Sequence, residues 1–394
     1  MFSVNEAIDS LLAGGRRLVE SEEIDLLSAP GRTLAEDIIA SLDVPPADNS
    51  AMDGYVFRQG DWQAAQSELP ISQRITAGSV PHALEPGTAA RIFTGAEVPA
   101  GADTVVMQEH CEGSVEAVRI LRLPAAGANI RPRGQDITTG QKILPAGHRM
   151  RGQDMGLLAS QGIAKIPVYR RLKVAILSTG DELIEPGKEL RGGQIYNSNR
   201  FTMHGQLAAW GFEVVDLGVA RDDPEAIRTL FEKAAATADV ILSSGGVSVG
   251  EEDHVKDVVE SLGSIDLWRI AIKPGKPFAF GQVKGTPFLG LPGNPVSVFV
   301  TMLIIGRPYL FCCQGTTDTT VHAVRHTACF EKRGSAREDY IRVRLGEKGL
   351  EPFSSQSSGV LLSTSWGDGL VRQPVHEDIK QGDRVEFLPW PILN

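Results

Sequence analysis

Apolar and polar residues alternate along the chain with two periods, and the period changes several times. Apolar residues recur at helical spacing over residues 4–11, directly after a capping box formed by Ser3 and Glu6. Residues 45–140 instead give short alternating runs separated by Gly and Pro turns, which predicts a β block. A second helical pattern at residues 154–161 indicates that this β block is inserted into an α-rich first domain.

From residue 172 apolar strands alternate with capped helices. Asp223 followed by Pro224 is an N-cap with proline at the first helical position. The alternation predicts a doubly wound α/β domain that ends near Gly315. The expected strands are residues 172–178, 212–220, 239–243 and 267–273, and the expected helices are residues 198–210, 224–236 and 253–262.

The last eighty or so residues return to period two, at 320–330, 339–346 and 384–390, which predicts a small β domain. The fold class is therefore multidomain α/β plus β. The expected division is an N-terminal elongated domain (1–44 and 141–171), an inserted β domain (45–140), the α/β domain (172–315) and a C-terminal β domain (316–394).

The overall charge excludes two classes of partner. The 394 residues carry 49 acids and 39 bases, a net charge of -10, which would repel a nucleic-acid backbone or an anionic membrane. The apolar stretch 296–305 is about half the length that crosses a bilayer and is expected to be a buried helix. With acids at Glu6 and Asp9 and no basic region, the N-terminus predicts a cytoplasmic protein.

Cysteine and histidine spacing gives no metal site. The four cysteines contain no C-x-x-C pair and are expected to be reduced thiols. His322 and His326 share one face of a predicted strand without a third ligand, so a structural role is favoured.

Small and polar residues concentrate in loops of the α/β domain. If the strands are parallel, their carboxyl ends meet at one edge, and the loops converge on one pocket. Backbone N–H groups of such loops bind anions, which favours a phosphate. Neither G-x-x-x-x-G-K-[ST] nor G-x-G-x-x-G after a strand is present. The four loops are residues 178–182, 243–250, 273–276 and 292–295.

Charged residues of both signs flank these loops. Arg269, Lys273 and Lys276 form a short basic stretch without an acid. On one strand, Arg269 and Lys273 would share a face and bind the same oxyanion. The acids at 181–182, 222–223 and 251–253 are either N-caps or, beside an anion, oxygen ligands for Mg²⁺.

Seven motifs occur in order along nearly the whole chain, and together they resemble the MoeA family of molybdopterin molybdenumtransferases, which is related to the E domain of gephyrin. They are DNSAMDGY (48–55), IFTGA (92–96), RGQD (133–136), STGDEL (178–183), GGVSVGEED (245–253), IKPGKPFAFG (272–281) and LPGNPVSV (291–298).

The resemblance implies insertion of molybdate into adenylylated molybdopterin, with Mg²⁺-dependent release of AMP. It also implies an elongated homodimer in which the α/β domain of one subunit faces the β domain of the other, so that the active site is shared. Other molybdenum cofactor biosynthesis proteins are expected partners. Tungstate in place of molybdate stays open.

Carried over by motif, the expected active-site residues are Asp53, Thr94, Asp136, Glu182, Asp222, Asp253, Arg269 and Lys273. The expected substrate-binding residues are Ser178, Thr179, Gly180, Ser244, Gly245, Gly246, Ser248, Gly250, Lys276, Pro292 and Asn294. Magnesium is expected on Glu182, Asp222 and Asp253. Arg269 stands where some relatives have lysine, which keeps the charge and changes its geometry.

Two alternatives stay open: an enzyme of a different step of the same pathway, and a protein of another functional class. The related molybdopterin adenylyltransferase shares the α/β domain and its Gly-Gly loop but lacks the DNSAMDGY block, and it would consume ATP. A gephyrin-like scaffold would be expected to carry a long disordered linker, and the sequence has none.

Overall fold

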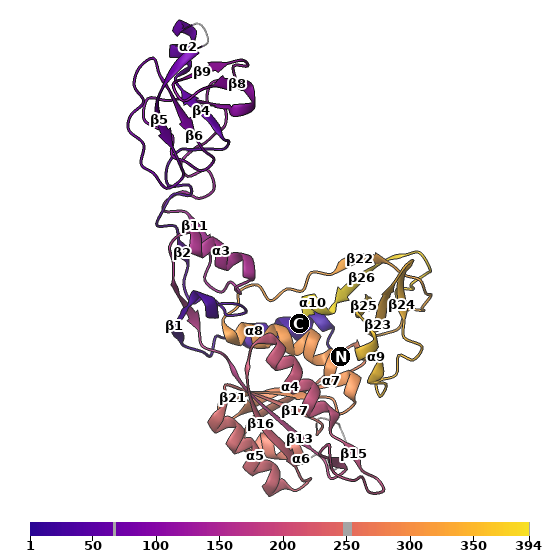
Figure 1. Cartoon of the computed structure of the whole chain (residues 1–394). Helices are drawn as coiled ribbons and strands as arrows, with labels where there is room; N and C mark the ends of the chain where they lie inside the picture. Colours follow the sequence, from indigo (N-terminus) through magenta and orange to yellow (C-terminus); the bar gives the residue numbers. More distant parts are fainter. Residues whose placement is uncertain (66–67, 247–253, 394) are drawn as a thin grey trace. The chain divides into compact units, whose positions relative to one another are not determined.

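The structure is a computed structural model that describes residues 1–65, 68–246 and 254–393. The chain forms two compact units, drawn in Figure 1. The large unit contains Met1–Glu36, Ala146–Arg151 and Lys165–Asn394, and the small unit contains Asp37–Pro145 and Gly152–Ala164. The small unit is thus an insertion into the large one. The finer four-domain division remains a prediction.

The large unit is built on a six-stranded sheet in the order β16-β13-β17-β21-β20-β18. Neighbours from β16 to β21 are parallel, and β20 and β18 are antiparallel to their neighbours. The carboxyl ends of four parallel strands therefore meet at one edge. The strands are β13 (Lys173–Thr179), β16 (Glu213–Ala220), β17 (Val240–Ser244), β18 (Gly263–Arg269), β20 (Pro277–Val283) and β21 (Thr286–Leu291).

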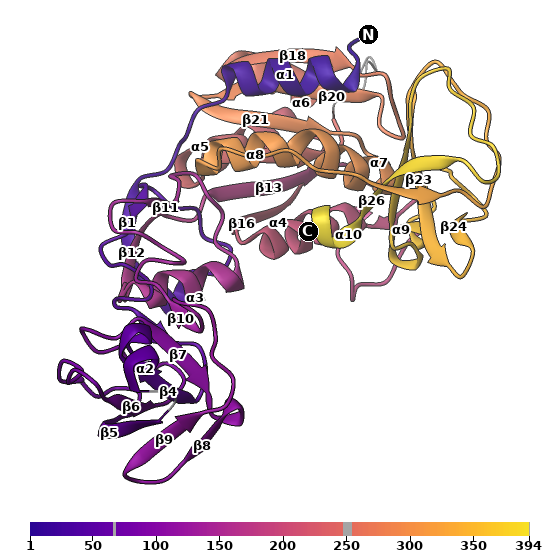
Figure 2. The same cartoon turned by 90° about the horizontal axis from the view of Figure 1, so that it is seen from above.

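Helices cover both faces of this sheet, as the doubly wound prediction requires. One face packs against α5 (Pro224–Thr237) and α6 (His254–Leu262). The other packs against α4 (Ser198–Trp210) and α7 (Pro295–Thr301). Figure 2 shows α1 (Val4–Gly14) running beside the sheet edge formed by β18.

The helix ends follow from local chemistry. Ser3 and Glu6 make the predicted capping box of α1. Asp223 caps α5 by accepting from the N–H of Ala226. Helix α4 ends at Gly211, whose φ of 88° is the left-handed conformation that glycine adopts at helix ends. All three helices begin within one residue of their predicted starts.

The predicted strand 267–273 is wrong as a single element. Strand β18 ends at Arg269 because the N–H of Ile270 bonds to the carbonyl of Lys276 and that of Ala271 to Phe2. The chain then enters β19 (Ile272–Lys273), which leaves the α/β sheet. It pairs in parallel with β23 (Glu338–Gly346) of the C-terminal sheet. The KPGK loop consequently connects the C-terminal sheet, through β19, to strand β20 of the α/β sheet.

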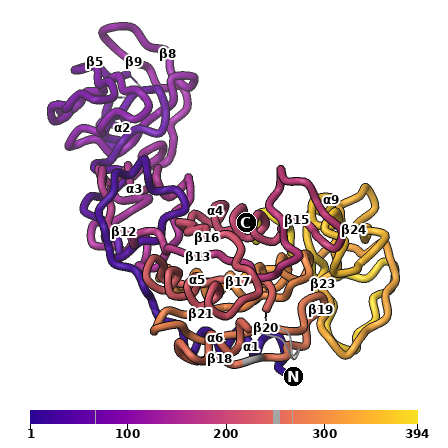
Figure 3. The backbone as a smooth tube through the Cα atoms, turned by 90° about the horizontal axis from the view of Figure 1, so that it is seen from below, coloured from indigo at the N-terminus to yellow at the C-terminus, as the bar shows by residue number. Residues whose placement is uncertain are grey.

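The C-terminal sheet has the order β19-β23-β25-β26-β22, with β24 paired to β23. Figure 3 shows β19 lying against β23. The predicted strand 320–330 is shorter in the structure. The remaining elements are β22 (Val324–Thr327), β24 (Gly349–Pro352), β25 (Gly369–Gln373), β26 (Arg384–Pro389), α9 (Leu362–Trp366) and α10 (Trp390–Leu393).

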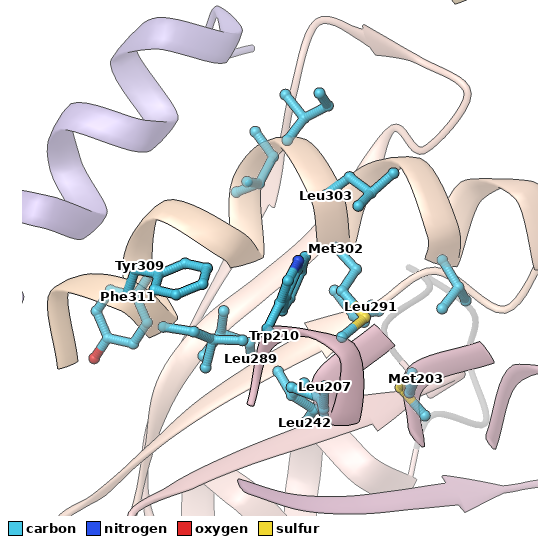
Figure 4. Close-up of a cluster of buried hydrophobic side chains, with 14 of the residues drawn as sticks. Met203, Leu207, Trp210, Leu242, Leu289, Leu291, Met302, Leu303, Tyr309 and Phe311 are labelled. Atoms are coloured by element: carbon cyan, nitrogen blue, oxygen red, sulfur yellow. The ribbon is translucent and has the colours of Figure 1, made fainter. Parts of the chain in front are cut away.

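The most apolar stretch is a core helix, as predicted. It runs from α7 through the π-helical segment Met302–Gly306 into α8 (Arg307–Gln314). Pro295–Gln314 is, within the described residues, the one helix long and apolar enough to span a membrane, and 83% of its apolar window is buried. Figure 4 shows the side chains it packs against, with Trp210 among them.

The small unit contains β strands within the predicted block 45–140, together with the helix α2 (Gln59–Ala65). Its sheet has the order β7-β4-β6-β5-β9-β8. The larger strands are β4 (Gly54–Phe57), β5 (Glu68–Ile75), β6 (Ala89–Ile92), β7 (Thr104–Met107), β8 (Cys111–Gly113) and β9 (Ala117–Ile120). Shorter elements of this unit are β2 (Ile38–Ile39), β3 (Asn49–Ser50), β10 (Ile130–Arg131), β11 (Lys142–Leu144) and α3 (Gly152–Ser160). The large unit further contains β1 (Ser21–Asp25), β12 (Lys165–Tyr169), β14 (Leu183–Ile184) and β15 (Ile195–Tyr196).

Candidate anion-binding site

A cavity of about 630 Å³ lies at the carboxyl edge of the α/β sheet, where the C-terminal sheet meets it. Three of the four predicted loops line it, together with a wall from the C-terminal β region. The lining residues are Gly245, Gly246, Lys273, Pro274, Gly275, Lys276, Pro277, Pro292, Gly293, Asn294, Ser297, Arg337, Gln356, Ser357 and Ser358.

The floor of the cavity consists of backbone from the ends of β17 and β21. The N–H of Gly245 bonds to the carbonyl of Leu291 at 3.2 Å, which joins the two loops. Gly246 has a φ of 66°, and a Cβ there would lie 2.3 Å from Val255, so only glycine fits. On the far side, the Asn199 amide donates to the carbonyl of Gly293 at 2.7 Å and fixes the PGN loop.

The predicted Ser178–Glu182 loop does not share this cavity. Ser178 and Thr179 are buried at the end of β13, and the hydroxyls of Ser178 and Ser244 are 3.0 Å apart. The next residue, Gly180, lines a second cavity of about 520 Å³ with Asp181. Among the described residues, the expected convergence of four loops on one pocket is therefore corrected to three, because the loop after β13 lines a cavity with the end of β16 instead.

The charged side chains that line the main cavity in the described part of the chain are all positive. Lys273, Lys276 and Arg337 line it, and no acid is among its described lining residues. Arg337 donates from Nη1 to the carbonyl of Ile272 at 3.4 Å, which sets its guanidinium next to the KPGK loop. In a chain of net charge -10, this local excess of cations indicates an anionic ligand.

Arg269 is not part of this group. It is exposed at the end of β18 and is absent from the cavity lining, whereas Lys273 lies beyond the turn in β19. The two residues do not share a strand face, because the chain changes sheets between them.

The predicted magnesium carboxylates lie at the ends of β13 and β16. Glu182 and Asp222 are both exposed, and the N–H of Asp222 bonds to the Asp181 carboxylate at 3.1 Å. Among the described residues, no group of three or more His, Cys, Asp or Glu side chains has metal-binding geometry. Two carboxylates with waters and substrate oxygens do suit Mg²⁺. Asp253, Ser248 and Gly250 lie outside the described residues.

In the small unit, two predicted residues meet directly. Asp53 Oδ1 accepts from the N–H and from the hydroxyl of Thr94, both at 2.8 Å. These bonds, the backbone one foremost, lower the pKa of Asp53 below its ordinary value. Asp136 is exposed, and its N–H donates to the carbonyl of Val44 at 2.9 Å. Asp53 is thus an anion at neutral pH.

Replacing Thr94 by Val should raise the pKa of Asp53 part of the way to its ordinary value, because the hydroxyl is lost and the N–H bond stays. A ¹³C NMR titration of the Asp53 carboxyl measures this, and Thr94→Ser should keep the low pKa. Because the pKa of Asp53 is lower in the folded state than in the unfolded state, its ionised form stabilises the fold above the unfolded-state pKa. This stabilisation is lost as the pH falls through the folded-state pKa. An unchanged pKa in the Val variant would contradict this account.

Sequence reasoning missed the C-terminal wall of the cavity. No recognised motif marks this wall, and the sequence predicts only a small β domain there. The residues of the wall are Arg337, Gln356, Ser357 and Ser358. The buried Arg342 supports this wall by donating to the carbonyl of Ser357 at 3.2 Å. Its burial lowers the pKa of Arg342 to about 10, so it remains a cation near neutral pH.

These features define an α/β protein with a cation-lined cavity between its parallel sheet and an attached β region. Family models match three segments: the MoeA N-terminal region (domain I and II) at residues 2–162, a probable molybdopterin binding domain at 175–311, and the MoeA C-terminal region (domain IV) at 328–390.

Two related proteins also align with most of this chain. A molybdopterin molybdenumtransferase of Haemophilus influenzae is 42% identical over 80% of this chain and 78% of its own, and one of a Nostoc species is 37% identical over 95% and 89%. The crystal structure of a molybdopterin biosynthesis MoeA protein from Pyrococcus horikoshii OT3 superposes with a TM-score of 0.85 at 29% identity, covering 98% and 99%. The chain belongs to the molybdopterin molybdenumtransferase family.

Proposed function

We propose that this protein is a transferase of molybdenum cofactor biosynthesis that inserts molybdate into adenylylated molybdopterin and releases AMP. The observation that carries the proposal is the cavity with Lys273, Lys276 and Arg337 on its walls and no acid among its described lining residues. The relatives' printed name, molybdopterin molybdenumtransferase, supports the same activity.

The cavity suits the chemistry of this substrate. Adenylylated molybdopterin carries a phosphoanhydride, and molybdate is a second oxyanion, so both need positive charge and N–H donors. Lys273, Lys276 and Arg337 provide the charge, with Arg337 able to bind two oxygens at once. Fixed cations at the phosphoanhydride stabilise the charge that develops as AMP leaves. Molybdenum binds before AMP leaves: the two dithiolene sulfurs bond to it, and their two protons leave with one oxide of molybdate as water. A second water molecule then cleaves the phosphoanhydride into AMP and the phosphate of the molybdenum-loaded pterin.

Magnesium belongs to this proposal as a cofactor held by Glu182, Asp222 and Asp253. When bound, the ion neutralises phosphate oxygens and so favours departure of AMP. The exposed carboxylates of Glu182 and Asp222 supply hard oxygen donors, which Mg²⁺ prefers.

We further propose a homodimer in which Asp53, Thr94 and Asp136 of one subunit complete the site of the other. The paired Asp53 and Thr94 form a preorganised polar loop with no other chemistry assigned to it. We also propose that Arg269 keeps its predicted active-site role and that Ser178, Thr179 and Gly180 bind the substrate. We also propose that the protein is cytoplasmic and associates with other molybdenum cofactor biosynthesis proteins.

The purified protein should release AMP from adenylylated molybdopterin when Mg²⁺ and molybdate are both present, as followed by chromatography. Omitting molybdate, or chelating Mg²⁺ with EDTA, should abolish the release. AMP release that needs no molybdate would contradict the proposal, as would no release at all. Consumption of ATP in the presence of molybdopterin would instead identify an adenylyltransferase. Repeating the assay with tungstate in place of molybdate measures the preference for either metal.

A further inference from the structure

Lys273, the cation central to the proposed function, is bound to a buried carboxylate outside the motif that contains it. We infer that Asp339 is a positioning residue for Lys273, and that Lys332 shares this carboxylate so that Lys273 can leave it for the substrate anion. The inference rests on the proposed function and concerns residues of the C-terminal sheet.

The backbone brings these groups together. Lys273 of β19 is the direct parallel partner of Asp339 in β23. Lys273 Nζ lies 3.2 Å from Asp339 Oδ2, and Lys332 Nζ lies 2.8 Å from the same oxygen. The three groups therefore form one cluster beneath the KPGK loop.

The carboxylate depends on its lysines. Its side chain is only 3% exposed. Neither oxygen of Asp339 accepts a well-directed hydrogen bond from the residues that the structure describes, so the two ammonium groups are its ion-pair partners, with a further electrostatic contribution from Arg342. A buried charge that loses its partner is strongly unfavourable. If Lys273 were the sole partner, moving it to a substrate oxygen would leave Asp339 uncompensated.

The two lysines differ in a way that assigns their roles. Lys332 is the closer and less exposed, with 22% of its side chain accessible, against 39% for Lys273. Lys273 lines the cavity, whereas Lys332 is absent from the lining. Lys332 thus keeps Asp339 compensated throughout, while Asp339 holds Lys273 at the wall until an anion enters.

Labelling of the free protein with acetic anhydride, read by mass spectrometry, tests the cluster without any substrate. Acetic anhydride reacts with the neutral amine of a lysine. A paired carboxylate favours the protonated ammonium, so a lysine in an ion pair is labelled more slowly than an unpaired one. Asp339→Asn should raise labelling of Lys273 about threefold or more, and Lys332→Gln should lower it because Lys273 becomes the sole partner. Lys276, in the same cavity, is the internal control and should label as in the wild type.

A double variant makes the test specific. In Asp339→Asn, adding Lys332→Gln should have no further effect on Lys273, since the carboxylate that couples the lysines is gone. Lys332→Arg should restore wild-type labelling. Unchanged labelling of Lys273 in Asp339→Asn would overturn the inference, and so would a Lys332→Gln effect that persists in the double variant.

The kinetic signature separates positioning from folding. Asp339→Asn should lower kcat while the affinity for AMP, measured by calorimetry, is kept or increased, because an anion has been removed near the cavity. Lys332→Gln should raise KM with kcat near the wild-type value. Loss of AMP affinity and kcat together in Asp339→Asn would assign a merely structural role. If the wild type releases no AMP, the proposed function fails, yet the labelling result still decides the positioning of Lys273.

Discussion

Substitution of Lys273 by Ala should lower the turnover number for AMP release about a hundredfold, the usual effect of removing one group that stabilises developing charge. Lys273 is the only described cation of the cavity that is also held by a buried carboxylate. Its ammonium therefore lies at a fixed place in the wall rather than on a free chain. The fold should survive the change, because Lys332 still compensates Asp339.

Lys165→Ala is the matched control for this variant. It removes the same charge from an exposed surface pair with Glu23, away from the cavity lining, and should leave turnover within about twofold. Steady-state kinetics of both variants, with circular dichroism of each, make the comparison. Wild-type turnover in Lys273→Ala would exclude a role for this lysine in catalysis.

The α/β part of the fold could be predicted because its signals are local. The Asp223-Pro224 pair sets the start of α5, and Gly211 sets the end of α4. Apolar runs bounded by such caps leave few alternatives to a βαβ alternation. The same locality placed the Gly-Gly and PGN loops at strand ends, and both line the cavity.

The site itself was only partly predictable, because its remaining parts depend on pairings between distant residues. Nothing in the sequence 267–273 marks the change of sheet after Arg269, which is made by backbone bonds to Phe2 and Lys276. The prediction therefore put Arg269 beside Lys273. The true neighbour is Arg337, whose partner is the carbonyl of Ile272.

The burial of Asp339 and its contacts with the two lysines could not be predicted from the sequence either. In the sequence it begins an alternating strand, where an acid would be expected to face solvent. The parallel pairing of β19 with β23 buries it and places it against Lys273 and Lys332. The pairing of β19 with β23, two strands far apart in the sequence, turns this residue from an expected surface acid into a partner of the site.

Trp210→Ala should reduce the stability of the large unit by about 3–5 kcal/mol, the cost typical of a large aromatic removed from a core. The side chain is 1% exposed and its ring lies 5.9 Å from that of Phe311 in α8, in the cluster of Figure 4. Its indole N–H also donates to the carbonyl of Leu393, so the substitution leaves both a void and an unpaired acceptor. Urea unfolding followed by circular dichroism measures the loss.

Phe201→Ala provides the control on the same helix, because Phe201 is 54% exposed and should cost no more than about 0.5 kcal/mol. Substitution of Trp210 should also affect the anion-binding cavity. Helix α4 carries Asn199, which holds the PGN loop through the carbonyl of Gly293, so loosening the core under α4 should weaken AMP binding as well as stability. If Trp210→Ala unfolds at the same urea concentration as Phe201→Ala, the packing of α4 on α7 and α8 is not what supports this side of the cavity.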